Sequence, residues 1–93
     1  FDRIFERQVE ALMKNGDVLI GITTSGNSSN ICKAIEKAND LGAVTISLTG
    51  NSGGKAREIS TKNINIESQN TARIQEMHIL IGHIFCDYID KNF

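Results

Sequence analysis

The spacing of apolar residues switches along the chain between a helical period and short, nearly continuous apolar runs. Helical spacing covers Phe1 to Lys14 and stops at Asn15-Gly16, a pair suited to a left-handed C-terminal cap. An apolar run then follows from Asp17, with its core at Val18 to Ile22. Such a run is typical of a strand that is buried on both faces of a parallel sheet.

The same alternation continues to the end of the chain. The remaining predicted elements are a helix over Asn30 to Leu41 ended by Gly42, a strand over Ala43 to Leu48, a short helix around Lys55 to Ile59, a weaker strand over Asn63 to Ile66, and a long, mostly buried helix over Ala72 to Tyr88. A strand, a glycine-rich turn, a helix and a second strand form a βαβ unit, whose crossover is almost always right-handed. The pattern therefore predicts the α/β class.

The first strand runs into the segment TTSGNSSN, Thr23 to Asn30, which we call the hydroxyl loop. It leads into a helix N-terminus, where unpaired N–H groups and a partial positive charge favour an anion. The loop therefore indicates a phosphorylated ligand. An alternative is that Ser28 or Ser29 only caps the helix, and both roles can coexist.

A second glycine-rich turn follows the second strand, over Thr49 to Gly54, and repeats the pattern of the first, TGNS against SGNS. We call it the second turn. Gly and Asn supply positive φ angles and Ser caps helices, so similar turn geometry alone is enough to explain the repeat.

Composition narrows the functional classes. The 93 residues are 40% hydrophobic and 23% charged, which suits one small domain. A net charge of −1 argues against a nucleic-acid surface. No apolar run has the length of a membrane span, and the first residues lack the order of a secretory signal. We therefore expect a cytoplasmic protein. Cys32 and Cys86 are far apart and are expected to be buried free thiols.

Three strings together resemble a known family: GDVLIGITTSGNS (Gly16 to Ser28), ISLTGNSGGKAREI (Ile46 to Ile59) and TARIQEMHILIGHIFCDYI (Thr71 to Ile89). They closely resemble the phosphoheptose isomerases, within the sugar isomerase (SIS) domains. The resemblance implies a three-layer α/β/α sandwich with a five-stranded parallel sheet of flavodoxin-like order, assembled as a homotetramer. Residues 1–93 would then be the C-terminal portion of one SIS domain, with its later strands and helices only.

The resemblance also implies a reaction. These isomerases convert sedoheptulose 7-phosphate to D-glycero-D-manno-heptose 7-phosphate, for the heptose of bacterial surface polysaccharides such as lipopolysaccharide. An aldose–ketose isomerisation needs an open-chain sugar, a base that moves a proton between C1 and C2, and stabilisation of the enediol. It needs no redox cofactor.

The family's phosphate-binding positions correspond to four hydroxyl residues of the hydroxyl loop: Thr23, Thr24, Ser25 and Ser28. Backbone N–H groups from Gly26 onward would add hydrogen bonds to the phosphate oxygens.

The family's metal and catalytic positions correspond to Gln75 and His83 on the last helix. Eight residues separate them by roughly 12 Å of rise and about 80° beyond two full turns, and His83 leans back toward Gln75. The resemblance implies one zinc ion, with a His and a Glu from an earlier segment as the other two ligands, and that Glu as the base. His83 is also a candidate acid or base. A histidine on an apolar helix is, by itself, more often a hydrogen-bonded core residue.

Other residues of this helix have structural interpretations. His78 is about 140° away from His83 and is expected to be structural. Thr71 is expected to cap the helix, although in the family this corner lies close to the sugar. Arg73 and Glu76 are expected to form solvated or structural salt bridges with neighbours. The apolar stripe is expected to be core or subunit interface: Ile74, Met77, Ile81, Ile84 and Tyr88.

Two rival functions belong to other classes. One branch of the family binds a bacterial replication initiator and promotes its assembly, and it lacks the histidine at the position of His83. A sugar-phosphate-binding regulatory SIS domain is the second alternative. The histidine and the small Ser25 favour the enzyme. We expect these 93 residues alone to be inactive and to aggregate or remain partly unfolded, because the first strand would have an open edge.

Overall fold

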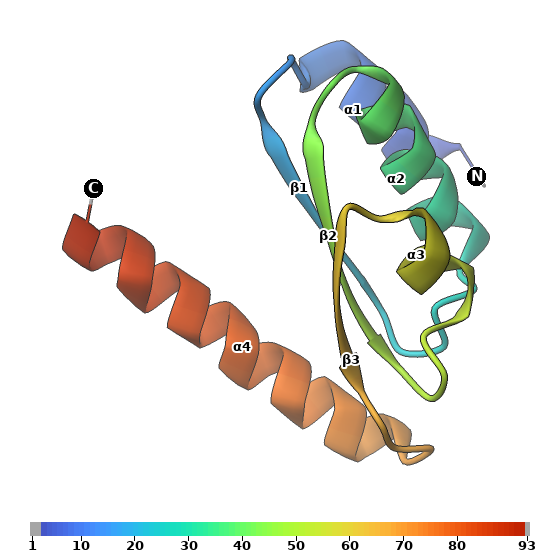
Figure 1. Ribbon diagram of the computed structural model, residues 1–93, viewed down its shortest axis with the longest axis vertical. Helices are drawn as coiled ribbons and strands as arrows, with labels where there is room; N and C mark the ends of the chain where they lie inside the picture. Colours follow the sequence, from blue (N-terminus) through green and yellow to red (C-terminus); the bar gives the residue numbers. More distant parts are fainter. Residues whose placement is uncertain (1–2, 93) are drawn as a thin grey trace.

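The chain forms a three-stranded parallel sheet with helices on both faces (Figure 1). The structure, a computed structural model, describes residues 3–92. The elements are α1 (Ile4–Leu12), β1 (Val18–Thr23), α2 (Ser29–Asp40), β2 (Val44–Gly50), α3 (Gly54–Ile59), β3 (Lys62–Ile66) and α4 (Thr71–Asn92). The strand order is β1-β2-β3, and both pairings are parallel. The predicted α/β class is confirmed.

The C-terminal ends of α1 and α4 differ from the sequence prediction by two residues or more. α1 ends at Leu12 because Met13 is already extended, with ψ 147°. Gly16, with φ +91°, therefore turns the chain toward β1 and does not cap the helix. Phe1, where the predicted helix began, lies outside the described residues. α4 continues past Tyr88 to Asn92.

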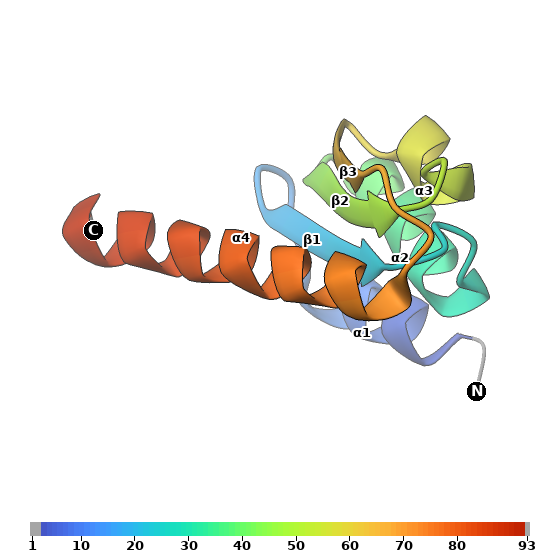
Figure 2. The ribbon, with the colours of Figure 1, turned by 90° about the horizontal axis from the view of Figure 1, so that it is seen from below.

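Helices α1, α2 and α3 cover one face of the sheet, and α4 lies on the other (Figures 1 and 2). On the first face, Gly21 of β1 lies against α2: a Cβ there would be 3.1 Å from the Ile31 side chain. On the second face, Gly50 of β2 lies against Ile74 of α4, which is fully buried. Glycine therefore allows a helix to approach the sheet closely on both faces.

The face of β2 toward α2 and α3 is buried but polar, with Thr45, Ser47 and Thr49 all 0% exposed. Thr45 Oγ1 donates to Asn39 Oδ1 at 2.8 Å. Asn63 Nδ2, on β3, donates to both Ser47 Oγ at 2.8 Å and Thr49 Oγ1 at 2.9 Å. Buried hydroxyls cost stability unless they are hydrogen-bonded, and these are.

The other face of the sheet is less buried than the sequence predicted. Val18, Ile20 and Ile22 are 56%, 42% and 52% exposed, so the expectation that β1 is buried on both faces is wrong for the described residues. The physical reason is the path of α4, which leaves the sheet as it continues toward its C-terminal end (Figure 1). β1 pairs only with β2, so its predicted open edge is confirmed within residues 3–92.

For the same reason, the prediction that the last helix is mostly buried is wrong. Only Ile74 and His78 of α4 are buried among the described residues, and the rest of its apolar stripe is not core: Met77, Ile84 and Tyr88 are 40%, 57% and 63% exposed. Cys86 on this helix is exposed, contrary to expectation, whereas Cys32 on α2 is a buried free thiol as predicted.

The contact between Gly50 and Ile74 can be tested by replacing each of two glycines with alanine in the intact protein. In Gly50→Ala the new Cβ would lie 2.8 Å from both Cγ atoms of Ile74, so α4 must shift. We expect a loss of about 1–3 kcal/mol in the free energy of unfolding, measured in urea. Gly82→Ala is the matched control: nothing lies within 4 Å of its Cβ, and helix propensity favours alanine by about 0.5–1 kcal/mol. Equal stability of the two variants would contradict this account of how α4 is attached.

Candidate functional site

The loops that follow β1, β2 and β3 lie together at one edge of the sheet (Figure 1). This is a consequence of the parallel pairing, which puts the carboxyl ends of all three strands at that edge. In open α/β sheets, ligands bind at this edge. The hydroxyl loop joins β1 to α2 here, and the second turn joins β2 to α3.

The hydroxyl loop forms a tight turn in which solvent exposure increases from Thr23 to Ser25. Thr23 is 7% exposed, Thr24 is half-buried, and Ser25 is exposed. The Gly26 N–H donates to the Thr23 carbonyl at 3.2 Å, and the Asn27 N–H donates to Ser25 Oγ at 3.1 Å. The N–H groups of Gly26 and Asn27 are thus both engaged within the loop, and phosphate binding by backbone N–H groups from Gly26 onward stays a prediction.

Ser28 lies at the N-cap of α2, with φ −62° and ψ 119°. Its side chain makes no capping hydrogen bond, so the capping interpretation is wrong for Ser28. Its half-buried hydroxyl lies at the positive end of the helix dipole. That position suits a phosphate oxygen.

The second turn lies directly against the hydroxyl loop, and the turn and the start of α3 together make three hydrogen bonds to it. The Ala56 N–H, just after the turn, donates to the Gly26 carbonyl at 2.8 Å, and the Lys55 N–H donates to Asn27 Oδ1 at 3.0 Å. Asn51 Nδ2 donates to the Thr24 carbonyl at 3.2 Å. The sequence analysis did not predict this role of the second turn, although the repeat of SGNS as TGNS could have indicated that the two turns pair.

The two turns touch through backbone atoms. A Cβ on Gly26 would overlap the Gly53 carbonyl oxygen, and both residues have positive φ angles, +77° and +92°. The buried Cys32 Sγ lies 3.6 Å from the Gly26 carbonyl oxygen. Burial, opposed by Lys55, raises the pKa of the Cys32 thiol, so it remains a neutral donor to that carbonyl.

Gln75 and His83 are both exposed on α4. Gln75 lines a groove of about 380 Å³ together with Ile22, His78, Ile79 and Gly82. Ile22 directly precedes the hydroxyl loop, so the structure brings Gln75 toward the start of that loop. His83 is not among the residues that line this groove, so the structure does not bring the two predicted ligands together in one pocket.

His78 is 3% exposed, and its Nε2 lies 2.8 Å from the Thr49 carbonyl oxygen. A carbonyl only accepts, so Nε2 carries the proton. Nδ1 is buried and has no hydrogen-bond partner within residues 3–92. His78 thus attaches α4 to the end of β2, which agrees with its structural interpretation.

Zinc in proteins takes four ligands in most structural sites and three plus water in many catalytic ones. The described residues contain no group of three or more His, Cys, Asp or Glu side chains that could hold a metal ion. The amide oxygen of Gln75 and a ring nitrogen of His83 are suitable donors, but they are only two. Gln75 and His83 alone would therefore leave such a site short of at least one protein ligand.

The start of α4 corrects a further expectation. Thr71 is the first helical residue, and the preceding residue, Asn70, caps the helix: its Oδ1 accepts from the Arg73 N–H at 3.3 Å. Arg73 Nη1 lies 3.3 Å from Glu76 Oε2, with both side chains largely exposed. The predicted salt bridging of these residues is therefore confirmed: they pair with each other in a solvated surface ion pair, which contributes little to stability.

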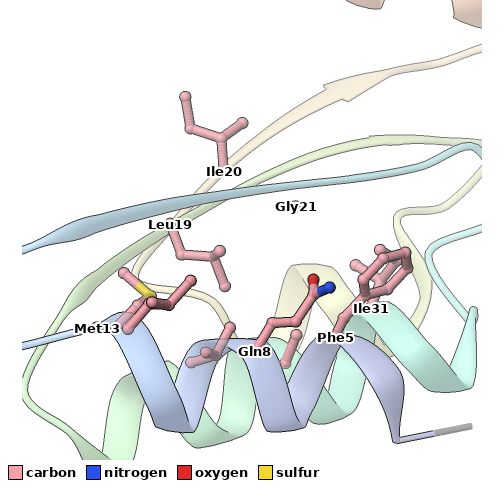
Figure 3. A pocket seen from close by; sticks show the side chains of 10 residues that line it. Phe5, Gln8, Met13, Leu19, Ile20, Gly21 and Ile31 are labelled. Atoms are coloured by element: carbon pink, nitrogen blue, oxygen red, sulfur yellow. The ribbon is translucent and has the colours of Figure 1, made fainter.

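Two other hollows differ in chemistry. An apolar groove of about 380 Å³ lies between α1 and β1, where Leu19 points toward Met13 and Ile20 points to the opposite face (Figure 3). Gln8 is the polar side chain in its lining, so the groove does not suit a phosphate. A polar pocket of about 590 Å³ lies at the loops after β2 and β3 and is lined by Asn51, Ser52, Arg57, Asn65, Glu67, Ser68 and Gln69.

No helix within residues 3–92 is both long and apolar enough to cross a membrane.

Comparison with known families and sequences gives a consistent result. Residues 1–50 match the SIS domain family. The chain is similar to a phosphoheptose isomerase from Aliarcobacter butzleri, with 56% identity over 91 residues, which are 98% of this chain and 48% of the relative. A phosphoheptose isomerase from Helicobacter pylori (strain Shi470) is 55% identical over 93 residues, which are 100% of this chain and 48% of that protein. The chain thus spans about half the length of these relatives.

Solved structures give the same result for the fold. A phosphoheptose isomerase from Neisseria gonorrhoeae matches with a TM-score of 0.94 and 46% identity, over 98% of this chain and 51% of that chain. One from Francisella tularensis matches with a TM-score of 0.94 and 45% identity, over 99% of this chain and 50% of that chain. The arrangement of helices and strands described above is therefore the one found in half of each of these proteins.

The contact between the two turns can be tested with Gly26→Ala in the intact protein. The new Cβ would separate the hydroxyl loop from Gly53, so we expect the affinity for inorganic phosphate, measured by calorimetry, to fall about tenfold or more. Gly16→Ala is the matched control, because Gly16 also has a positive φ, +91°, but nothing lies within 4 Å of its Cβ. The control should lose about 1–2 kcal/mol of stability and keep its phosphate affinity. Equal phosphate affinities in the two variants would show that the contact does not shape the loop.

Proposed function

The chain belongs to the SIS-domain family, and on that basis we propose that the protein is a phosphoheptose isomerase. The proposed reaction converts sedoheptulose 7-phosphate to D-glycero-D-manno-heptose 7-phosphate. Support comes from relatives of that name at 55–56% identity and from the geometry of the hydroxyl loop. Residues 1–93 would form the C-terminal portion of the SIS domain.

The observation that carries the proposal is the fixed hydroxyl loop at the carboxyl edge of the sheet. Thr23, Thr24, Ser25 and Ser28 are the proposed phosphate-binding residues. The Ser28 hydroxyl is not used as a cap, and it lies at the N-terminus of a 12-residue helix. Hydroxyl donors at a helix N-terminus suit a phosphate dianion.

The reacting carbons lie at the far end of the open-chain sugar from the phosphate, and the proton transfers follow from the chemistry of the ketose. A base removes a proton from C1 while the C2 carbonyl oxygen gains one, which gives the enediol. Return of a proton to C2 and loss of the O1 proton then give the aldose, with no net oxidation. His83, exposed on α4, is our proposed acid or base at these oxygens or in ring opening.

Gln75 and His83 are also the proposed ligands that this chain contributes to one zinc ion, with the remaining ligands from elsewhere in the assembled protein. A bound zinc would polarise the substrate oxygens. The support is the exposure of both side chains on one helix and the position of Gln75 in a groove next to Ile22. A homotetramer in the cytoplasm, serving heptose synthesis for surface polysaccharide, completes the proposal. The exposed apolar residues of α4, such as Ile84 and Tyr88, favour an oligomer interface.

Turnover of sedoheptulose 7-phosphate by the intact protein tests the reaction. In His83→Ala we expect kcat to fall about 10²- to 10⁴-fold, as for loss of a general acid or base, and zinc content per protomer to fall with it. Asp87→Ala is the control, because Asp87 lies one turn further along α4, is exposed, and pairs with Lys91 at 3.1 Å. It should retain both turnover and zinc.

Two outcomes would overturn parts of this proposal. Undiminished turnover in His83→Ala would remove His83 from the catalytic residues. Absence of turnover in the zinc-loaded wild type would instead favour the family's binding branch, in which an SIS domain promotes assembly of a replication initiator.

A further inference from the structure

Asn51 connects all three loops at the carboxyl edge of the sheet. It directly follows β2, its N–H donates to the Ser68 carbonyl at 2.9 Å, and its own carbonyl accepts from Asn65 Nδ2 at 3.0 Å. These two bonds fix it to the end of β3 and to the loop that follows. Its side-chain Nδ2 then reaches the hydroxyl loop and donates to the Thr24 carbonyl at 3.2 Å.

The backbone of Asn51 is in the left-handed region, with φ +54°, and it is the one non-glycine residue within residues 3–92 with a positive φ. Asparagine tolerates this conformation better than most residues. Glycine would tolerate it as well but has no amide to donate. The position therefore combines a backbone that few side chains accept with a side chain that makes a specific hydrogen bond.

The bond to Thr24 orients a peptide group. In a trans peptide the carbonyl and the following N–H point in opposite directions, and no cis peptide occurs within residues 3–92. Because Asn51 holds the Thr24 carbonyl toward the second turn, the Ser25 N–H points away from that turn. The Gly26–Asn27 peptide, two peptide groups later, is oriented in the same way, because the Ala56 N–H holds the Gly26 carbonyl at 2.8 Å.

The orientation of this peptide matters for an anion. A phosphate is attracted by N–H groups and repelled by carbonyl oxygens, so a rotated Thr24–Ser25 peptide would turn an attractive group into a repulsive one. The Ser25 N–H makes no hydrogen bond to another described residue, whereas the N–H groups of Gly26 and Asn27 are used within the loop. The Thr24–Ser25 peptide thus combines an orientation set from outside the loop with an N–H that no other described residue uses.

We propose that Asn51 is a positioning residue for phosphate binding: its amide holds the Thr24–Ser25 peptide so that the Ser25 N–H faces the bound phosphate. This inference rests on the proposed function, in which the hydroxyl loop binds the phosphate of the sugar. Asn51 itself does not contact the phosphate. It acts through the backbone of the hydroxyl loop.

The test compares Asn51→Gly with Ser52→Gly in the intact protein. Asn51→Gly keeps the positive φ and removes only the amide, so we expect the Kd for inorganic phosphate, measured by calorimetry, to rise about three- to tenfold. KM for sedoheptulose 7-phosphate should rise by a similar factor while kcat stays within about twofold of wild type. Ser52→Gly loses a side chain from the same turn but keeps the Asn51 amide, so its phosphate affinity should be that of wild type.

Each outcome decides the matter. A rise in Kd confined to Asn51→Gly supports the positioning role, and Asn51→Asp, which places a carboxylate oxygen against the Thr24 carbonyl, should weaken phosphate binding further. An unchanged Kd in Asn51→Gly, an equal rise in Ser52→Gly, or a wild type that binds no phosphate overturns it. A fall in kcat without a rise in KM also overturns it. A wild type that binds phosphate but does not isomerise the sugar overturns the proposed reaction alone, because the phosphate Kd still reports on Asn51.

Discussion

The close approach of two backbones, at Gly26 and Gly53, is the constraint on which the candidate site depends. A Cβ on Gly26 would overlap the Gly53 carbonyl oxygen, and a Cβ on the neighbouring Gly54 would lie 2.7 Å from the Ser25 carbonyl oxygen, so no side chain fits between these turns at Gly26 or Gly54. Once the backbones touch, polar groups on each side reach the other, and the Ala56 N–H and Asn51 amide hold two carbonyls of the hydroxyl loop. The loop is then fixed before any ligand arrives, which is how a binding site avoids an ordering cost at the moment of binding.

A continuous set of hydrogen bonds links this loop to the long helix. His78 Nε2 bonds the Thr49 carbonyl, Thr49 Oγ1 donates to Asn65 Oδ1, and Asn65 Nδ2 donates to the carbonyl of Asn51. Asn51 in turn donates to Thr24. Each member is a side chain or carbonyl at the carboxyl end of a strand or on α4, so the polar interior of the sheet positions the hydroxyl loop relative to α4. An apolar residue in place of Thr49 would keep the carbonyl but would lose the hydroxyl that joins it to Asn65.

The sequence predicted the element order, the parallel sheet and the hydroxyl loop, because local periodicity and turn residues determine them. It did not predict burial on the second face, since Val18, Ile20 and Ile22 look the same whether or not a neighbour covers them. It also missed the role of Asn51. The local sequence around an asparagine is the same whether its side chain only suits the turn or also binds a distant carbonyl. Contacts between Asn51 and Thr24, 27 residues apart, depend on strand register and not on local pattern.

The two halves of the candidate site differ in how completely the described residues fix them. The hydroxyl loop is held by backbone contacts from the second turn and by the buried Cys32 behind it, so its shape is determined within these residues. Gln75 and His83 stand exposed on a helix that the sheet holds mainly at Ile74 and His78, and solvent-exposed side chains of this length sample several rotamers. Catalysis requires such groups within about half an ångström of their working positions. The proposed phosphate end is therefore preorganised by the chain's own turns, whereas the proposed reacting end would need a further protein surface against α4 to become equally fixed.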